Sequence, residues 1–251
     1  MRRAVLEWGR FILIWGVCVL SFRAFAFGSY YVPSESMLPT LAVGDHFIAA
    51  KYAYGYSRHS PDITLPEGFI PTADGRLLSH LPQRGDIVVL KPEGAPEALV
   101  KRVIGLPGDT VQLAHGRLVL NGQVISRHET GAYDYRDDHG RTVHVTEYVE
   151  DLPATDGGLA RHAVLQRSDE GPADNTGVYT VPAGHVFLMG DNRDNSQDSR
   201  FPYPDLGFVP LDRVIARAQF TAYTNHFCKA ESDLTCPGGD WSTRFGRSLK
   251  P

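Results

Sequence analysis

Apolar residues are arranged in two different ways along the chain. Near the N-terminus they form one nearly continuous run from Phe11 to Phe27, which would span about 25 Å as a helix. After Asp45 they occur in short runs rich in β-branched and aromatic residues, separated by turn sequences such as PQRGD, LPGD and VPAG. Asn121-Gly122 is the strongest hairpin signal among these turns. We therefore expect a mainly β protein, with an N-terminal transmembrane helix followed by an antiparallel β-rich domain.

The N-terminal run has the features of a membrane anchor. Three arginines and one glutamate precede it, which predicts a cytoplasmic N-terminus and places the chain after about Ser29 on the other side of the membrane. Its length is slightly short of a hydrocarbon core of about 30 Å. Arg23 lies near the far end and can extend its guanidinium to the headgroups, where Tyr30 and Tyr31 would also be suited.

A cleavable signal peptide is the rival interpretation of this run. Such a peptide also has a basic start and an apolar stretch, but small residues must follow at its cleavage site. Here bulky aromatic residues crowd that region, namely Phe25, Phe27, Tyr30 and Tyr31. We therefore predict an uncleaved, single-pass anchor.

The pattern changes again between about Ser126 and Asn175, where the chain is polar with some alternation, as in RTVHVTEYVE. This stretch is interpreted as an insertion between core strands, either a small β subdomain or a set of long surface loops. Its histidines have no metal-ligand spacing, and we expect them to be solvated: His128, His139, His144 and His162. The expected division of the chain is an N-terminal segment with the anchor (1–28), the first part of the core (29–125), an inserted, partly β subdomain (126–183), the second part of the core (184–225) and a C-terminal tail (226–251).

Composition narrows the class of protein. Apolar residues make up 42% and charged residues 22% of the 251 positions, which is typical of a folded protein and excludes global disorder. A formal charge of −4 gives no basic surface for nucleic acid. Cys18 lies in the apolar run, whereas Cys228 and Cys236 lie in the tail, where a disulfide and two reduced thiols both stay open. No zinc-binding spacing accompanies them.

Three stretches carry candidate chemistry. The first, PSESMLPTL, places Ser34 and Ser36 two residues apart in a rigid, non-helical segment, although a hydroxyl that caps a turn is the commoner explanation of such serines. The second, LVKRVIG, embeds Lys101 in an apolar run, where burial would lower the pKa of its amine; a solvated strand face is the alternative.

The third stretch is GDNRDNSQDSR, which is rich in side-chain oxygens. A calcium loop starting at Asp191 would be the obvious interpretation. However, Arg193 occupies its third position, and the loop lacks a glycine at the sixth position and a glutamate at the twelfth. The sequence therefore argues against calcium.

Together with GDHFIAAKYAYG, these stretches resemble bacterial signal peptidase I (leader peptidase), motif by motif and in the same order. The resemblance covers the anchor and roughly Ser29–Asp109 and Gly184–Tyr223, while the insertion and the tail match little. It implies a membrane-bound serine endopeptidase that cleaves N-terminal signal peptides from exported preproteins after small residues of the Ala-x-Ala type. It also implies no cofactor and no metal, and partners that are preproteins and the lipid bilayer, not nucleic acid. The location implied is the bacterial inner (cytoplasmic) membrane, with the catalytic domain periplasmic or otherwise extracytoplasmic.

The resemblance also implies a role for individual residues. Ser36 matches the nucleophile and Lys101 the general base of a Ser/Lys dyad. Ser34 matches the serine whose hydroxyl forms the oxyanion hole with the backbone N–H of Ser36. Ser196 matches the serine that orients the lysine, and a supporting polar pair is matched by Asp198 and Arg200.

Two positions depart from the family pattern. Glu35 stands between the two serines, where the family usually has glycine, so the local charge or backbone geometry differs. Leu99 stands two residues before the lysine, where some members have tyrosine.

The physical chemistry agrees with a Ser/Lys dyad. A serine hydroxyl needs a base, and a lysine serves as one only when neutral, so its pKa of about 10.4 must be lowered by burial. No recognisable His/Asp triad motif is present in the chain. Two alternatives stay open: a protease with a narrower substrate, in conjugation or pilus assembly, and an inactive membrane-tethered β domain that binds partners.

Overall fold

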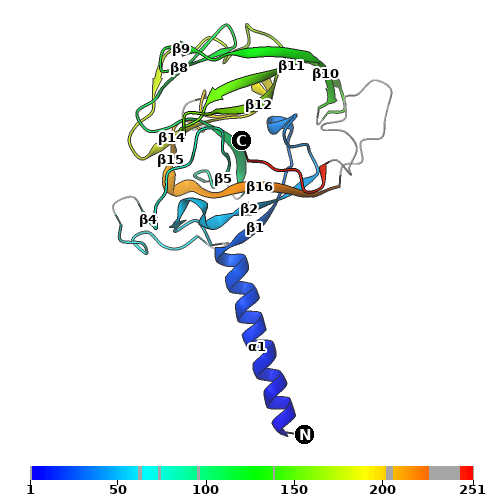
Figure 1. The fold of residues 1–251 in the computed structure, drawn as a ribbon, viewed down its shortest axis with the longest axis vertical. Coiled ribbons are helices and arrows are strands. Elements are labelled where there is room, and N and C mark those ends of the chain that lie inside the picture. The colour runs from blue at the N-terminus through cyan, green and yellow to red at the C-terminus, as the bar shows by residue number, and fades with distance from the viewer. Residues whose placement is uncertain are drawn as a thin grey trace.

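The computed structural model describes residues 2–61, 64–72, 75–94, 97–137, 139–201, 206–225 and 244–250. The predictions on Cys228 and Cys236 concern positions outside these residues. Helix α1 (Arg2–Phe25) projects from a body built of strands, as Figure 1 shows. Within the described part of the chain, its segment Glu7–Phe25 is the one helix long and apolar enough to cross a membrane, and none of it is buried against the body.

The helix ends two residues before the apolar run does. Phe27 already belongs to strand β1 (Phe27–Tyr31), whose register pairs it with Ala50. Tyr30 was expected at the membrane interface, but its ring stacks on Phe47 with the centroids 5.7 Å apart. The aromatic residues after the anchor therefore begin the sheet, because alternation along a strand points every second one into the core.

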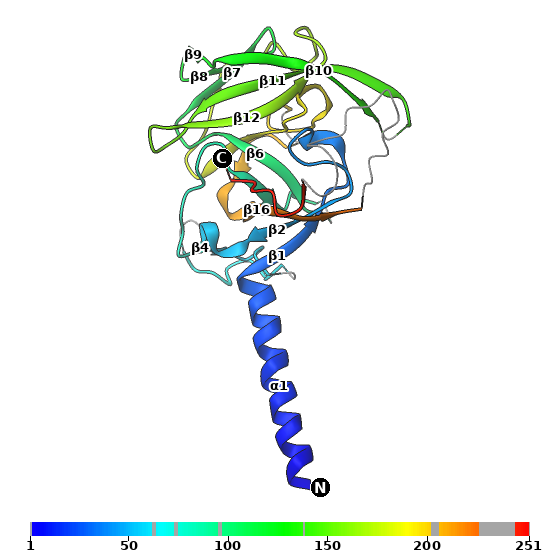
Figure 2. The same ribbon diagram turned by 45° about the vertical axis from the view of Figure 1, so that its right-hand side comes forward.

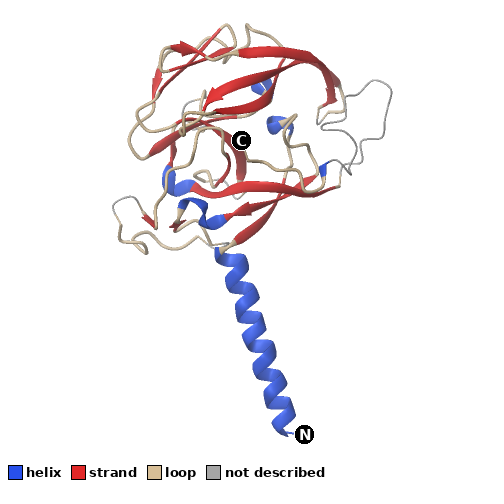
Figure 3. Cartoon of the chain, viewed as in Figure 1, coloured by secondary structure: helices blue, strands red, loops and turns tan. Residues whose placement is uncertain are grey.

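The central element is a seven-stranded sheet in the order β1-β2-β16-β5-β6-β14-β15. Every strand pair in it is antiparallel. This confirms the prediction of a mainly antiparallel β fold with an N-terminal apolar helix (Figure 3). The remaining bounds of its strands are β2 (Asp45–Ala50), β5 (Ile87–Leu90), β6 (Leu99–Gly105), β14 (His185–Met189), β15 (Val209–Pro210) and β16 (Val214–Thr224).

Two further sheets cover one side of the central sheet. The four-stranded one has the order β13-β7-β8-β9, and the three-stranded one has the order β10-β11-β12. Their strands are β7 (Thr110–Ala114), β8 (Arg117–Leu120), β9 (Gln123–Val124), β10 (Arg127–Arg136), β11 (Thr142–Pro153), β12 (Leu159–Gln166) and β13 (Tyr179–Thr180). A small ladder, β3 (Tyr56–Ser57) with β4 (Arg76–Leu77), completes the described strands. The sheet of β10, β11 and β12 lies at the end of the molecule away from α1 in both views (Figures 1 and 2).

The predicted hairpin at Asn121-Gly122 is confirmed. Both residues have positive φ, 51° and 76°, and they join β8 to β9. This backbone twist matches that of the flanking strands. One expectation about the insertion is wrong, because His162 on β12 is buried with its Nε2 3.5 Å from a carboxylate oxygen of Glu150.

The core lies where these layers meet. One apolar cluster joins the central sheet to the four-stranded sheet through residues such as Ile104, Val111 and Phe187. A second cluster packs the segment after β1 against the central sheet, with Met37 and Leu41 buried on it. Burying a side chain of this size stabilises the fold by about 1.5–3 kcal/mol. The segment that contains both candidate serines is therefore held by the core although it is not a strand.

Candidate active site

Lys101 is placed by the central sheet. It lies on β6, where it pairs with Val88 of β5, and only 4% of its surface is exposed. Burial disfavours the ammonium form and lowers the pKa of Lys101, although the nearby carboxylates of Asp198 and Asp191 act in the opposite direction. The alternative of a solvated lysine on a strand face is therefore wrong.

Ser36 reaches the lysine from the other side, on a single turn of 3-10 helix, η1 (Glu35–Met37). Lys101 Nζ donates a hydrogen bond to Ser36 Oγ over 2.9 Å. Ser34 precedes this turn, and its Oγ lies 3.3 Å from Ser36 Oγ. The Ser34 side chain makes no capping hydrogen bond to the turn, so the explanation of this residue as a cap has no support. The structure thus brings Ser34, Ser36 and Lys101 together.

The turn that carries Ser36 is tied to the loop after β14. The backbone N–H of Asn192 donates to the carbonyl of Ser36 over 3.1 Å, and its side-chain amide donates to the carbonyl of Glu35 over 3.2 Å. Gly190 permits this close approach, because a Cβ at this position would lie 2.5 Å from the carbonyl oxygen of Ser36. Asn192 therefore holds the two peptide groups on either side of the Ser36 Cα.

A buried ion pair between Arg102 and Asp191 stabilises the loop after β14. Arg102 donates two hydrogen bonds of 2.7 Å to the two carboxylate oxygens of Asp191, and Thr40 Oγ1 donates to the same carboxylate over 2.5 Å. The charge of Arg102 and these hydrogen bonds outweigh burial and hold the pKa of Asp191 below its usual value. The network connects β6, the end of the Ser36 segment and the loop after β14.

Asp198 and Arg200 form a second buried pair close to the lysine. Arg200 donates to both oxygens of Asp198 over 2.9 Å. Burial raises the pKa of Asp198, but the charge and hydrogen bonds of Arg200 outweigh it and keep the pKa below its usual value. The two residues are paired with one another as the sequence analysis expected.

The hydrogen bonding of the Ser196 hydroxyl differs from what the resemblance implied. This hydroxyl is buried and has no hydrogen-bond partner of good geometry among the described residues, so the expected bond to Lys101 is not formed in this structure. The hydroxyl lies close to Asp198, whose pKa it helps to lower. A Cβ on Gly190 would lie 2.3 Å from Ser196 Oγ, so Ser196 packs directly against the loop that holds the Ser36 turn.

The reactive groups open on a cavity of about 440 Å³. Its wall includes Ser34, Ser36 and Lys101, with Leu99 and Leu206 as apolar lining. Two carboxylates, those of Glu35 and Glu93, and the side chains of Asn195 and Gln197 complete the polar part of the wall. Both positions that depart from the family pattern, Glu35 and Leu99, therefore border the cavity. Within the described residues, no group of three or more His, Cys, Asp or Glu side chains could hold a metal ion.

Sequence reasoning assigned no role to four residues that position the site: Thr40, Arg102, Asp191 and Asn192. A signal was present for two of them, because Asp191 and Asn192 belong to the GDNRDNSQDSR stretch that carried the resemblance. Their partners are distant in sequence, since Thr40 and Asp191 are 151 positions apart. Such a pairing leaves no local pattern in the chain.

Comparisons with known proteins identify a family that matches most of the chain. The family model described as signal peptidase, peptidase S26, matches residues 5–223. The signal peptidase I of Rickettsia bellii (strain OSU 85-389) is 37% identical over 231 residues, covering 91% of this chain and 76% of that protein. The signal peptidase I of Rickettsia massiliae (strain Mtu5) is 34% identical over 240 residues, covering 93% of this chain and 85% of that protein. A crystal structure of a signal peptidase I from Enterococcus faecalis V583 aligns with a TM-score of 0.31 and 26% identity, covering 55% of this chain and 97% of that one.

Proposed function

The chain belongs to the signal peptidase family, peptidase S26, and from this premise we propose that it is a membrane-bound endopeptidase with Ser36 as nucleophile and Lys101 as general base. As a member of this family it is a peptidase whose substrates are preproteins that carry signal peptides. The single observation that carries the proposed mechanism is the 2.9 Å contact between Lys101 Nζ and Ser36 Oγ in a buried setting. Such a contact favours an active enzyme over a tethered domain that only binds partners.

The proposed reaction begins with a neutral Lys101 amine. It takes the proton of Ser36 Oγ as the oxygen attacks the carbonyl carbon of the scissile bond. The tetrahedral intermediate then expels the amine of the mature protein, which leaves with the proton held by Lys101. A water molecule next attacks the acyl-serine ester and gives a proton to the Lys101 amine. The second tetrahedral intermediate then expels Ser36 Oγ, which takes this proton from Lys101, and the signal peptide is released with a free carboxyl group. Burial supports this role because it raises the neutral fraction of the amine.

The oxyanion needs hydrogen-bond donors at the nucleophile. We assign this task to the Ser34 hydroxyl and the backbone N–H of Ser36, supported by the 3.3 Å separation of the two serine Oγ atoms. Ser196, with its buried and unpartnered hydroxyl, is proposed to orient the Lys101 amine when the hydroxyl turns away from Asp198. The pair of Asp198 and Arg200 would hold this loop in place.

The substrate part of the proposal is cleavage after small residues of the Ala-x-Ala type. The cavity of about 440 Å³ beside the dyad accommodates short side chains, and Leu99 and Leu206 give it apolar walls. Helix α1 supports anchoring, because its apolar surface is unburied over Glu7–Phe25. We place the N-terminus in the cytoplasm and the β-rich body outside the inner membrane, in contact with the lipid bilayer and not with nucleic acid.

A cleavage assay tests this function. The purified full-length protein in detergent is incubated with a preprotein that ends its signal peptide in Ala-x-Ala, and the N-terminus of the product is sequenced. We expect one cut directly after the second alanine by the wild type and none by Ser36→Ala. Cleavage by Ser36→Ala at the wild-type rate would contradict the assignment of the nucleophile.

A further inference from the structure

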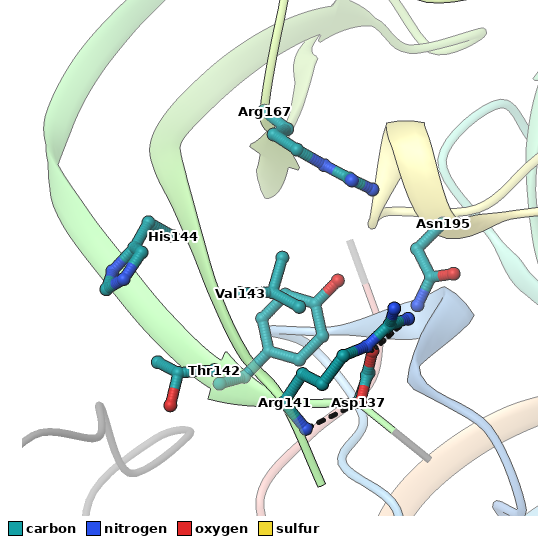
Figure 4. A pocket seen from close by; sticks show the side chains of 8 residues that line it. Asp137, Arg141, Thr142, Val143, His144, Arg167 and Asn195 are labelled. Carbon is teal, nitrogen blue, oxygen red and sulfur yellow. Dashed lines mark hydrogen bonds and ion pairs between the residues drawn. The ribbon is translucent and has the colours of Figure 1, made fainter. Parts of the chain in front are cut away.

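A second cavity has a volume of about 500 Å³, and Figure 4 shows the side chains that line it. Asn195 belongs to the walls of both cavities. The other walls of the second cavity come from the three-stranded sheet: Tyr135 at the end of β10, Thr142 and His144 at the start of β11, and Arg167 just after β12. The second cavity therefore adjoins the catalytic one at Asn195.

One positive charge in this cavity has no ion-pair partner among the residues that the structure describes. Arg141 pairs with Asp137 over 2.7 Å, and His144 pairs with Asp134 over 2.8 Å. The guanidinium of Arg167, by contrast, makes no hydrogen bond or ion pair with any residue that the structure describes. Its backbone N–H is held by Asp194 over 2.7 Å, and in Figure 4 the side chain extends across the cavity toward Asn195.

The two cavities differ in charge. The catalytic cavity carries the carboxylates of Glu35 and Glu93, of which Glu93 pairs with Arg213 over 3.6 Å, together with the amine of Lys101, whose pKa is lowered by burial. The second cavity carries the unpaired guanidinium of Arg167 beside one internally paired Arg and Asp. An acidic side chain of a bound substrate is therefore attracted to the guanidinium of Arg167 in the second cavity, although Glu35 also acts on Tyr135 there.

The position of the second cavity indicates which part of the substrate would enter it, the chain before the cleaved bond or the chain after it. The apolar part of a signal peptide partitions into the bilayer, and Glu7–Phe25 of α1 is the segment suited to the bilayer, so we expect the chain before the cut to run toward α1. The sheet of β10, β11 and β12 lies at the opposite end of the molecule in both views (Figures 1 and 2). The second cavity therefore receives the chain that follows the cut.

We propose that this cavity is a substrate subsite for the side chain of an aspartate or glutamate within the first few residues of the mature protein, and that Arg167 is the specificity-determining residue. The inference rests on the proposed function. Tyr135 and Asn195, whose side chains interact with each other, line the same space and add polar groups beside Arg167. An extended chain covers about 3.3 Å per residue, so only a few positions after the cut come within reach of Arg167.

The test uses the full-length protein in detergent and peptides with one Ala-x-Ala site. Each peptide carries Asp, Gln or Lys at one of the first five positions after the cut, and kcat/KM is measured for each. We expect a three- to tenfold preference for Asp over Gln at one position, mainly through KM, and a smaller preference at high salt. Arg167→Gln should reduce this ratio to about one, and Arg167→Glu should turn it into a preference for Lys.

Arg161→Gln is the matched control, because Arg161 lies on β12, the strand that ends directly before Arg167, but pairs with Asp151 outside the cavity. This variant should keep the wild-type ratio. An Asp preference that survives Arg167→Gln, or that Arg161→Gln removes equally, would overturn the subsite. Wild-type cleavage of all peptides at equal rates would also overturn it while leaving the proposed function intact. Failure of the wild type to cleave any peptide would instead refute the proposed function.

Discussion

Ser36 and Lys101 are held in place by opposite means. Lys101 lies on β6 inside a seven-stranded sheet, where ladder hydrogen bonds to β5 fix its backbone and apolar neighbours bury it. Ser36 lies on one turn of 3-10 helix, whose backbone depends on Asn192 and on the buried pair of Asp191 and Arg102. The base is therefore positioned by a pattern of strands, and the nucleophile by a few polar contacts.

This difference indicates how substitutions near each of the two residues should lower the activity. Substitutions near Lys101 act through packing and through the pKa of its amine. Substitutions that support Ser36 act through geometry, because loss of one polar partner moves the hydroxyl relative to a base that stays fixed. The predictions below test whether the two kinds of support are separate.

The largest effect is expected from removing the base. Lys101→Ala and Lys101→Arg should each lower kcat/KM by at least about a thousandfold, since a guanidinium cannot give up its proton at any usable pH. The fold should persist, because the sheet ladder does not involve the side chain. Cleavage rates and circular dichroism check both parts. More than a tenth of the wild-type rate in either folded variant would refute Lys101 as the base.

The next largest effect is expected from removing Asp191, whose ion pair with Arg102 stabilises the loop that holds the Ser36 turn. Asp191→Ala leaves the guanidinium of Arg102 buried without its partner and should lower the free energy of unfolding by about 3–5 kcal/mol, with loss of activity. The control is Asp151→Ala, which removes the exposed pair with Arg161 and should cost about 1 kcal/mol or less. Denaturant titration measures both. Equal losses in the two variants would mean that the Asp191 network does not hold the site.

Ser34→Ala removes a proposed oxyanion donor without disturbing a cap. We expect kcat to fall by about 10²–10³-fold with little change in KM, since such a donor acts mainly in the transition state. Ser34→Thr keeps the hydroxyl and should recover part of the rate. Steady-state kinetics that leave kcat of Ser34→Ala at the wild-type value would exclude Ser34 from the oxyanion hole.

The smallest effect is expected at Asn192. Asn192→Ala removes the hydrogen bond from the side-chain amide to the carbonyl of Glu35 but keeps the backbone hydrogen bond to Ser36. We therefore expect kcat to fall about tenfold and the free energy of unfolding to fall by about 1 kcal/mol. Asn175→Ala is the control, because it removes a side-chain bond to the backbone of His115 remote from the cavity. It should lower stability comparably and leave kcat unchanged. If both variants keep full kcat, the backbone contacts alone hold the turn.

Features that depend on neighbouring residues along the chain, such as strands, hairpins and the N-terminal helix, could be predicted from the sequence. Alternating apolar runs gave the antiparallel strands, and Asn121-Gly122 gave a hairpin because few residue pairs tolerate positive φ at both positions. The apolar run predicted the long N-terminal helix, but its end was placed too late, since Phe27 is equally suited to a helix in lipid and to a strand. The family motifs predicted that Ser34, Ser36 and Lys101 would meet, and they do in the structure.

The contacts that tie these motifs together were not predictable in the same way. Thr40 meets Asp191, and Arg102 meets Asp191, only after the sheet has formed, so no spacing along the chain reveals them. His162 looks like a surface residue in a polar stretch, yet β12 buries it against Glu150. The expected bond from Ser196 to Lys101 is absent, since the Ser196 hydroxyl lies instead toward Asp198.

The dependence of kcat/KM on pH tests the Ser/Lys dyad most directly. Burial lowers the pKa of Lys101, so the neutral, active amine accumulates at a lower pH than for an ordinary lysine. Activity should therefore rise with pH along an acid limb that lies above the range of histidine, near 6.5, and below about 10.4. The buried His59 and His162 have pKa values lowered to about 4, so they do not titrate in that range. A profile already flat from pH 6 upward in the wild type would contradict a lysine base, whereas an alkaline optimum with one ionisation on its acid limb is the result the dyad requires.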